Sequence, residues 1–288
     1  MTVIQMKKSS SLVMSMTLDN MNSEKKQMDW KKWAKDFGNS LIGNPDFRRD
    51  EPDVKIVPID IIVRDLSQIP EDHWWRYAFT REPMNSKFTD VQRRQLMEKA
   101  IACGREYADQ CAEKYGTNDP MIIAEKLGLK VDFPEQPQNG HRVLFAEYRD
   151  PNIVHIYADG VRRGEKLLEQ ESVSKILHDL DLNRMLLSHE IFHWLEKENE
   201  SSSIWTQTYE IKLWNIGKLE NHSHIACLSE IAAMAFAKRL MHFEMSPYVL
   251  DAFLDYGYSP KAGTALYEEM MAADNRMPDP AYSNKKED

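Results

Sequence analysis

The amino-acid sequence predicts an α+β fold that is mostly helical, with one small antiparallel sheet. Three observations support this class. Amphipathic segments with helix caps recur between residues 89 and 272, three short alternating segments lie together between residues 129 and 157, and an almost wholly apolar helix is expected around residues 185–195. The chain has 288 residues, of which 42% are hydrophobic, so it can bury one large core.

Composition and charge exclude several classes of protein. The formal net charge is −9, whereas a protein that binds nucleic acid directly needs a basic face, so no direct nucleic-acid binding is expected. No apolar run approaches the length of a membrane span. The three cysteines, Cys103, Cys111 and Cys227, have no paired spacing, which favours a reducing compartment. We therefore expect a cytoplasmic protein, and no feature of the sequence indicates its oligomeric state.

The two ends of the chain differ from its middle. Residues 1–27 show no periodicity and are predicted to be a disordered tail, and residues 273–288, rich in proline and charge, a second tail. Residues 28–88 form an arm to which the sequence assigns no role. A helix is predicted at 28–42, and a strand at 55–63 that Pro58 would confine to a sheet edge. The aromatic cluster at 73–77 either docks a partner or, as is more common, packs the arm onto the main domain.

The main domain is predicted to begin with two capped helices. Thr89 or Asp90 caps a long helix that ends at Gly116. Asp119 caps the next helix, which starts with a proline and ends at Gly128. Both helices carry start and stop signals at the expected distances, so their bounds are well defined by the sequence.

Strands and further helices follow. Three segments alternate in the manner of strands: 129–133, 143–148 and 153–157. The last two are joined by a hairpin turn at 149–152, and Asn139-Gly140 marks another turn. Besides the apolar helix at 185–195, four segments that follow the strands are predicted to be helical: 164–180, 230–241, 249–256 and 260–271. Residues 199–224 are polar and receive no assignment.

The apolar helix carries the pattern His-Glu-x-x-His, formed by His189, Glu190 and His193. Residues four apart lie on one face of a helix, with Cβ atoms about 5–6 Å apart, so two imidazoles can bind one zinc ion. Glu190 points to the same open side and can take a proton from a zinc-bound water molecule. The alternative is two histidines on a half-buried helix, with Glu190 in solvent. The flanks disfavour it, because a helix apolar nearly all round is buried, and buried polar groups need partners.

A catalytic zinc ion needs a third protein ligand and an open position. Metzincins place a histidine where this chain has Asn199 and a glycine where it has Glu196, and thermolysin-like enzymes place a glutamate where it has Lys212, so both patterns are excluded. Five candidates are left: Glu210, Glu220, Glu230, His222 and His224. Glu230 stands out because it opens an otherwise apolar helix. A carboxylate is also favoured at a helix N-terminus in its own right, by about 0.3–1 kcal/mol, so the helix alone leaves both explanations open.

Several segments together resemble the ImmA/IrrE family of zinc metallopeptidases. The resemblance covers residues 107–247 and is carried by four segments: the helix-Gly-strand lead at 119–131, the strand at 153–157, the approach to the motif at 183–190, and the helix at 230–241. It implies a zincin-like metallopeptidase domain at residues 89–272. It also implies that Glu230 is the third ligand, beside His189 and His193, and that Glu190 is the general base.

The resemblance also indicates a substrate class. Members of the family are associated with the cleavage of helix-turn-helix repressors, so the implied substrate is one specific cytoplasmic protein.

The chain departs from the family at Ala232 and Met234, where the family usually has Glu and Asn, and residues 160–180 look like an insertion. The first ninety residues match no family segment, and the chain carries no recognisable helix-turn-helix.

The expected function is hydrolysis of a peptide bond in a protein substrate, with Zn²⁺ as cofactor. Zinc would polarise the scissile carbonyl and lower the pKa of bound water to about 7, and Glu190 would carry the proton to the leaving amine. His222, His224 or Tyr209 could stabilise the oxyanion. One alternative is a zinc-stabilised binding or sensor protein without peptidase activity. Another is a self-acting protease whose residues 1–88 are inhibitor or substrate.

Overall fold

The computed structural model describes residues 52–135, 144–198, 204–216 and 219–276, with the backbone alone for 213–216 and 219–221. The chain divides into two compact units, Met1–Asp36 and Phe37–Asp288, and every described residue belongs to the second. The predicted tail at 1–27, the helix at 28–42, the turn at 139–140 and residues 277–288 lie outside the described residues.

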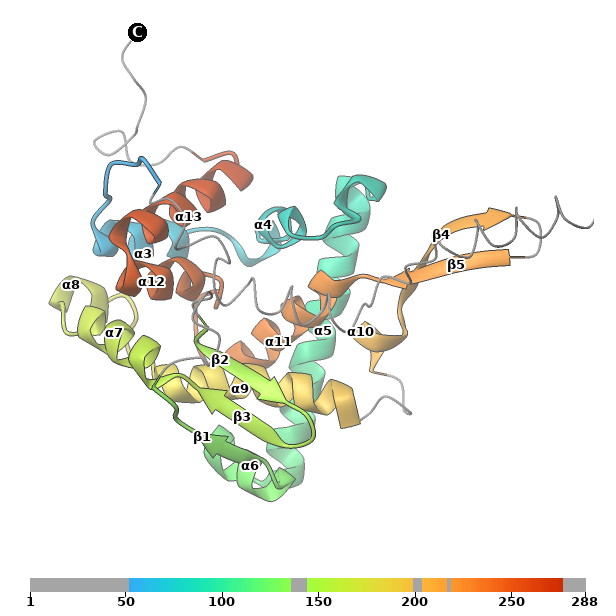
Figure 1. The fold of residues 1–288 in the computed structure, drawn as a ribbon, viewed down its shortest axis with the longest axis horizontal. Coiled ribbons are helices and arrows are strands. Elements are labelled where there is room, and N and C mark those ends of the chain that lie inside the picture. Colours follow the sequence, from blue (N-terminus) through green and yellow to red (C-terminus); the bar gives the residue numbers. More distant parts are fainter. Residues whose placement is uncertain (1–51, 136–143, 199–203, 217–218, 277–288) are drawn as a thin grey trace, which may run out of the picture. The chain divides into compact units, whose positions relative to one another are not determined.

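The described part is mostly helical and holds two small sheets, in agreement with the predicted α+β class (Figure 1). Its elements in chain order are α3 (Ile59–Ser67), η1 (Glu71–His73), α4 (Trp75–Thr80), η2 (Asn85–Lys87), α5 (Asp90–Tyr115), α6 (Pro120–Leu127), β1 (Lys130–Asp132), β2 (Ala146–Arg149), β3 (Ile153–Ile156), α7 (Ala158–Leu168), α8 (Glu171–Ser174), α9 (Leu182–Glu198), α10 (Trp205–Thr208), β4 (Glu210–Ile216), β5 (Leu219–His224), α11 (Ala226–Leu240), α12 (Val249–Tyr258) and α13 (Pro260–Ala273).

Helices α5, α9 and α11 pack together at the centre of this part. α11 contacts both of the others and is buried along most of its length, as is α9. Gly104 of α5 allows a close approach of two backbones, because a Cβ built at this position would lie only 2.0 Å from the carbonyl oxygen of Ala232 in α11. Phe192 of α9 and Phe236 of α11 are in ring contact, with centroids 5.7 Å apart. The two helices that carry the candidate ligands are therefore held in one core.

The two capped helices are confirmed. The Thr89 side chain accepts a hydrogen bond from the backbone N–H of Gln92, the Gln92 side chain accepts one from the backbone N–H of Thr89, and Gly116 ends α5 with φ of 67°. Asp119 caps α6, and Gly128 ends it with φ of 75°. Glycine adopts this left-handed conformation without the strain that a Cβ would bring.

The three predicted strands form one sheet in the order β1-β3-β2. β2 and β3 pair antiparallel, as the predicted hairpin requires. β1 pairs with β3 in parallel, so the expectation of a wholly antiparallel sheet is corrected for this pair: the chain passes through edge strand β2 before it returns alongside β1. β2 and β3 contact α9, which places one edge of the sheet beside the His-Glu-x-x-His helix (Figure 1).

The predicted strand at 55–63 is wrong, because this segment enters helix α3. Pro58 occupies the position before the helix, where a missing N–H costs nothing. The buried side chains recur with a spacing of three or four: Ile59, Ile62, Val63 and Leu66. That helical stripe packs on α12 and α13 and outweighs the β-propensity of the branched residues.

The aromatic cluster at 73–77 packs into the core, which confirms the second of its two interpretations. Trp74, Trp75 and Tyr77 are all buried. Trp74 stacks on Tyr248 with ring centroids 5.4 Å apart, and the Tyr77 hydroxyl donates a hydrogen bond to Asp251 at 3.1 Å. Trp74 and Tyr77 of the arm thus pack against the N-terminal end of α12.

Several later bounds differ from those predicted. The single helix predicted at 164–180 is replaced by two shorter helices, α7, which begins at Ala158 and ends at Leu168, and α8 at Glu171–Ser174. The unassigned stretch at 199–224 holds α10 and an antiparallel pair, β4 and β5. At the start of the predicted C-terminal tail, Asp274 lies 2.9 Å from Nδ1 of His73 and 3.1 Å from Nη1 of Arg76. These contacts join the C-terminal end of α13 to η1 and α4.

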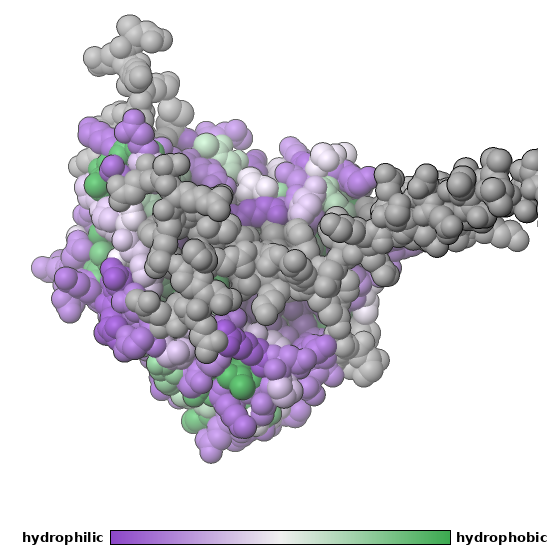
Figure 2. Space-filling view, viewed as in Figure 1, coloured by the Kyte–Doolittle hydropathy of each residue, from purple (hydrophilic) through white to green (hydrophobic). Residues whose placement is uncertain are grey.

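The visible surface is largely hydrophilic. In Figure 2, polar and charged side chains cover most of the described surface on that face, and apolar ones are scattered. Large apolar side chains that stay exposed among the described residues are few: Ile56, Val91, Met121, Ile122 and Phe133. Within the described ranges, no helix has both the length and the apolar character that a membrane crossing requires.

Candidate metal centre

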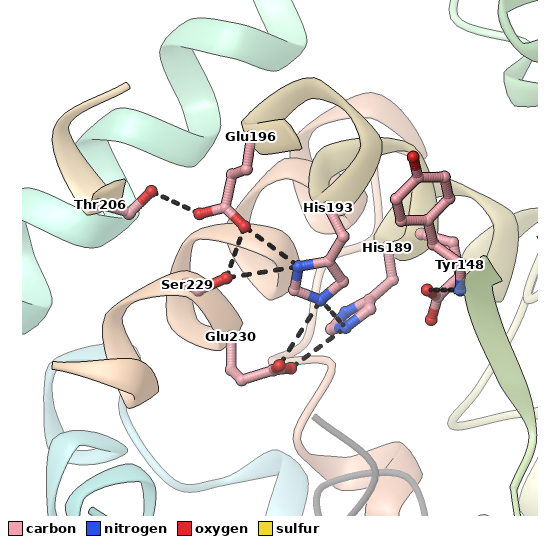
Figure 3. Close-up of polar contacts among 8 residues, drawn as sticks. Tyr148, His189, His193, Glu196, Thr206, Ser229 and Glu230 are labelled. Carbon is pink, nitrogen blue, oxygen red and sulfur yellow. Dashed lines mark hydrogen bonds and ion pairs between the residues drawn. The ribbon is translucent and has the colours of Figure 1, made fainter. Parts of the chain in front are cut away.

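Helix α9 places His189 and His193 on one face, one turn apart. Their Nε2 atoms lie 3.0 Å from each other and their ring centroids 4.8 Å. His189 is buried, and 19% of the His193 side chain is exposed. The predicted geometry of the motif is therefore present, with both Nε2 atoms directed to a common point (Figure 3).

Helix α11 brings Glu230 to the same point. Its Oε2 atom lies 3.2 Å from Nε2 of His189, and its Oε1 atom lies 3.6 Å from Nε2 of His193. Glu230 does not open its helix, as the sequence suggested, because α11 begins at Ala226 and Glu230 is its fifth residue. A helix N-terminus favours a carboxylate only within the first turn, so this explanation for Glu230 is removed.

The ligand atoms of the three side chains gather closely enough to hold one metal ion. Ligand atoms about 2.0–2.1 Å from one zinc ion, at tetrahedral angles, lie about 3.3–3.4 Å from each other. The two Nε2 atoms are 3.0 Å apart, near this value, and each approaches a different oxygen of Glu230, at 3.2 Å for Oε2 and 3.6 Å for Oε1. With one atom taken from each side chain, the three ligand atoms all lie within 4.8 Å of one another. Oε2 of Glu230 is buried and makes no hydrogen bond within the described part of the chain, although it lies 3.2 Å from Nε2 of His189. A cation bound between these atoms would satisfy this buried oxygen.

The charges of the centre reinforce one another. Burial alone would raise the pKa of Glu230, but the attraction of His193 and His189 outweighs it and holds this pKa far below its usual range. Burial alone would lower the pKa of His193, but Glu230 and Glu196 raise it well above its usual value. In the metal-free centre the ionised Glu230 is thus paired with a protonated His193, and a bound cation would take the place of that proton.

Glu190 lies beside this centre and is held by the sheet. Its Oε2 atom accepts a hydrogen bond of 2.7 Å from the backbone N–H of Tyr148, in edge strand β2. Burial raises the pKa of Glu190, and Glu230 raises it further, while the two histidines and the Tyr148 N–H lower it. The carboxylate therefore has a fixed direction and a higher affinity for a proton than an exposed glutamate has.

Glu196 is a further residue of the centre, and sequence reasoning does not identify it. Its Oε2 atom lies 3.2 Å from Nδ1 of His193 and accepts a hydrogen bond of 2.5 Å from Ser229, and its Oε1 atom accepts one from Thr206 (Figure 3). One signal was available, because Glu196 follows His193 by three residues and so shares its helix face. Its other partners come from α10 and α11, and no local pattern indicates them.

The remaining candidate ligands lie elsewhere. Glu210 of β4 contacts Nε2 of His224 at 3.1 Å and Nδ1 of His222 at 3.7 Å, both on β5. Tyr209 packs on Trp205 with ring centroids 5.3 Å apart. The Glu220 side chain lies outside the described residues. Among the described residues, the one group of His, Cys, Asp or Glu side chains whose ligand atoms converge as a metal requires is His189, His193 and Glu230.

Comparison of the chain with known protein families, curated proteins and solved structures finds no match. The functional assignment therefore depends on the geometry of this centre and on the residues that carry the resemblance.

Proposed function

We propose that the protein is a zinc-dependent metalloendopeptidase that hydrolyses a peptide bond in one specific cytoplasmic protein. The observation that carries this proposal is the convergence of His189, His193 and Glu230, from two helices, beside a second buried carboxylate, Glu190. Two imidazoles and one carboxylate leave a tetrahedral ion with one open position, which is the arrangement of a catalytic rather than a structural zinc site.

The three ligands would hold the ion, and Glu190 would move the proton. When bound, zinc supplies Lewis acidity toward the scissile carbonyl and the attacking water. Tyr148 fixes one oxygen of the Glu190 carboxylate, so that the other can accept a proton from the water. The protonated carboxyl would then donate to the leaving amine, as a general base that becomes a general acid does.

The substrate class follows from the resemblance to the ImmA/IrrE family, which indicates a helix-turn-helix repressor or a similar regulator. Hydrolysis of one regulator requires selective binding of that protein, which the centre alone does not provide. We therefore expect cleavage at one or a few sites, not general degradation.

Substitution of Glu190 by glutamine tests the proposal. The wild type and Glu190→Gln should be loaded with zinc and incubated with a native cell extract that contains folded proteins, and the new N-termini identified by mass spectrometry. The wild type should generate new termini at one or a few sites in one protein. Glu190→Gln should keep its zinc and lose activity by about 10²–10⁴-fold, the usual contribution of a general base.

A zinc-stabilised binding or sensor protein is the second candidate. One observation favours it: the Glu190 carboxylate is buried and already accepts a hydrogen bond from the Tyr148 backbone. Under this alternative, the wild type generates no new termini, and Glu190→Gln changes neither zinc content nor partner binding.

A further inference from the structure

The carboxylate of Glu196 lies on the far side of the His193 ring from the ligand atoms. Its side chain is 6% exposed. Oε1 accepts a hydrogen bond from the Thr206 hydroxyl, and Oε2 accepts one of 2.5 Å from the Ser229 hydroxyl. Nδ1 of His193 lies 3.2 Å from the same Oε2 atom and 3.3 Å from the Ser229 hydroxyl. The carboxylate is thus held by α10 and α11 and directed at one ring nitrogen of α9 (Figure 3).

These contacts decide which ring nitrogen of His193 carries the proton. A carboxylate only accepts hydrogen bonds, so an unprotonated Nδ1 would place two lone pairs against each other at 3.2 Å. The hydroxyl hydrogen of Ser229 is directed at Oε2, at the shorter distance, and is not available to Nδ1. Nδ1 must therefore carry a hydrogen. In the neutral imidazole Nε2 then has the free lone pair, and it faces His189 and Glu230.

We propose that Glu196 is a positioning residue for the metal centre, which accepts the Nδ1 hydrogen of His193 and so presents the Nε2 lone pair to a bound ion. Thr206 and Ser229 hold the carboxylate in the direction that this requires. The proposal rests on the proposed function, since it takes the ion to be the zinc of that function. It adds a residue and an element, α10, that the zinc-binding motif does not include.

A purely structural role for Glu196 would have a different signature. A buried ion pair stabilises or destabilises the metal-free fold, and its loss changes the free energy of unfolding. A partner that orients a metal ligand also changes metal affinity in the folded protein, by about 10–100-fold in known cases. The two roles are therefore separated by measuring both quantities.

Glu196→Gln is the direct test, with Glu198→Gln as its matched control. Glutamine has the shape of glutamate but a single, uncharged acceptor oxygen, so it cannot accept from Thr206 and from the His193 side at once. Glu198 lies at the end of the same helix and is exposed. Zinc affinity of the full-length proteins should be measured by competition with a chromophoric chelator, and the unfolding of the metal-free proteins by urea. We expect Glu196→Gln to bind zinc about 10–100-fold more weakly, and Glu198→Gln to match the wild type.

The outcomes separate this proposal from the proposed function. If the wild type and Glu198→Gln bind zinc and Glu196→Gln binds it equally well, the positioning role is overturned and the metal site stands. If the wild type binds no zinc, both are overturned. Should Glu196→Gln fail to fold, Ser229→Ala decides the question, because it removes one restraint on the carboxylate. Weaker zinc binding by folded Ser229→Ala supports the proposal, and unchanged binding overturns it.

Discussion

The carboxylate of Glu230 comes from α11, whereas His189 and His193 come from α9. The metal centre therefore depends on a second helix, α11, as well as on the helix that carries the motif. In the metal-free centre it balances the charge of His193, and in a loaded centre it would be the third ligand. The same side chain thus contributes to folding and to metal binding, and the two effects should be lost together.

Replacing Glu230 by alanine should abolish tight zinc binding. We expect the affinity to fall by more than the roughly 10–100-fold that loss of an outer partner of a ligand costs, because a ligand itself is removed. Elemental analysis of the purified variant measures this. Glu210→Ala is the control, since Glu210 pairs with His222 and His224 and should leave zinc content unchanged. Zinc retained by Glu230→Ala and lost by Glu210→Ala would show that the ligand assignment is wrong.

Asp255 of α12 should make the stability of the fold depend on pH. It is buried, and burial raises its pKa to about 7, although the attraction of Arg81 lowers it. In the unfolded chain an aspartate has a pKa of about 3.9. Between these values the folded state keeps a proton that the unfolded state has lost, so the free energy of unfolding falls as pH rises from about 4 to about 7.

Asp255→Asn removes this titration. From pH 4 to pH 8, the wild type should lose about 2–4 kcal/mol of unfolding free energy relative to the variant, as measured by urea denaturation at each pH. Asp179→Asn is the control, because the Asp179 side chain is 98% exposed and should leave the wild-type slope intact. Parallel curves for the wild type and Asp255→Asn would contradict the effect of burial.

The residues of the centre differ in how far the sequence could identify them. His189 and His193 lie one helical turn apart, so their spacing alone predicts their common face, and Glu190 follows from the motif that they form. Glu230 is remote in sequence, and spacing left it among several candidates until the resemblance favoured it. Glu196 was not identified, because its role depends on hydroxyls from α10 and α11 that no local pattern joins to it.

At the scale of elements, the contact between α5 and α11 supports the position of Glu230. Gly104 permits this contact, since a Cβ there would meet the backbone of Ala232. Backbone atoms cannot turn aside as a flexible side chain can, so the two helices would have to separate. A shift of α11 would also disturb the metal centre, because α11 packs on α9.

Gly104→Ala should therefore destabilise the protein, although alanine is the better helix former by about 1 kcal/mol. We expect a net loss of about 1–3 kcal/mol from overpacking, together with lower zinc content. Thermal denaturation and elemental analysis measure the two effects. Ala102→Gly, at an exposed position of the same helix, should show the ordinary cost of glycine. A Gly104→Ala variant more stable than the wild type would contradict this account of the helix contact.

Elements with local signals could be predicted, and those without could not. The caps of α5 and α6 are complete within a few residues, so the bounds follow from the sequence. The β-branched residues of 55–63 favour a strand, but the buried residues of α3 recur with helical spacing, and the helix forms. β4 and β5 were missed because the segment is polar and its pairing depends on cross-strand partners, not on alternation.

At the scale of the whole molecule, the sequence predicted the class but not every connection. The α+β class and the helical majority follow from patterning, which is a local property. The parallel pairing of β1 with β3 follows from the path of the chain, which patterning does not contain. The proposed assignment to the zincin-like metallopeptidases requires that the metal centre binds zinc.

Zinc content is the most direct test of that proposal. The full-length protein should be purified without chelator, and its zinc measured by elemental analysis against protein concentration. We predict about one zinc per chain, held by His189, His193 and Glu230, and a lower melting temperature once a chelator removes it. A protein that is fully folded, free of metal and unchanged in stability by added zinc would contradict the account.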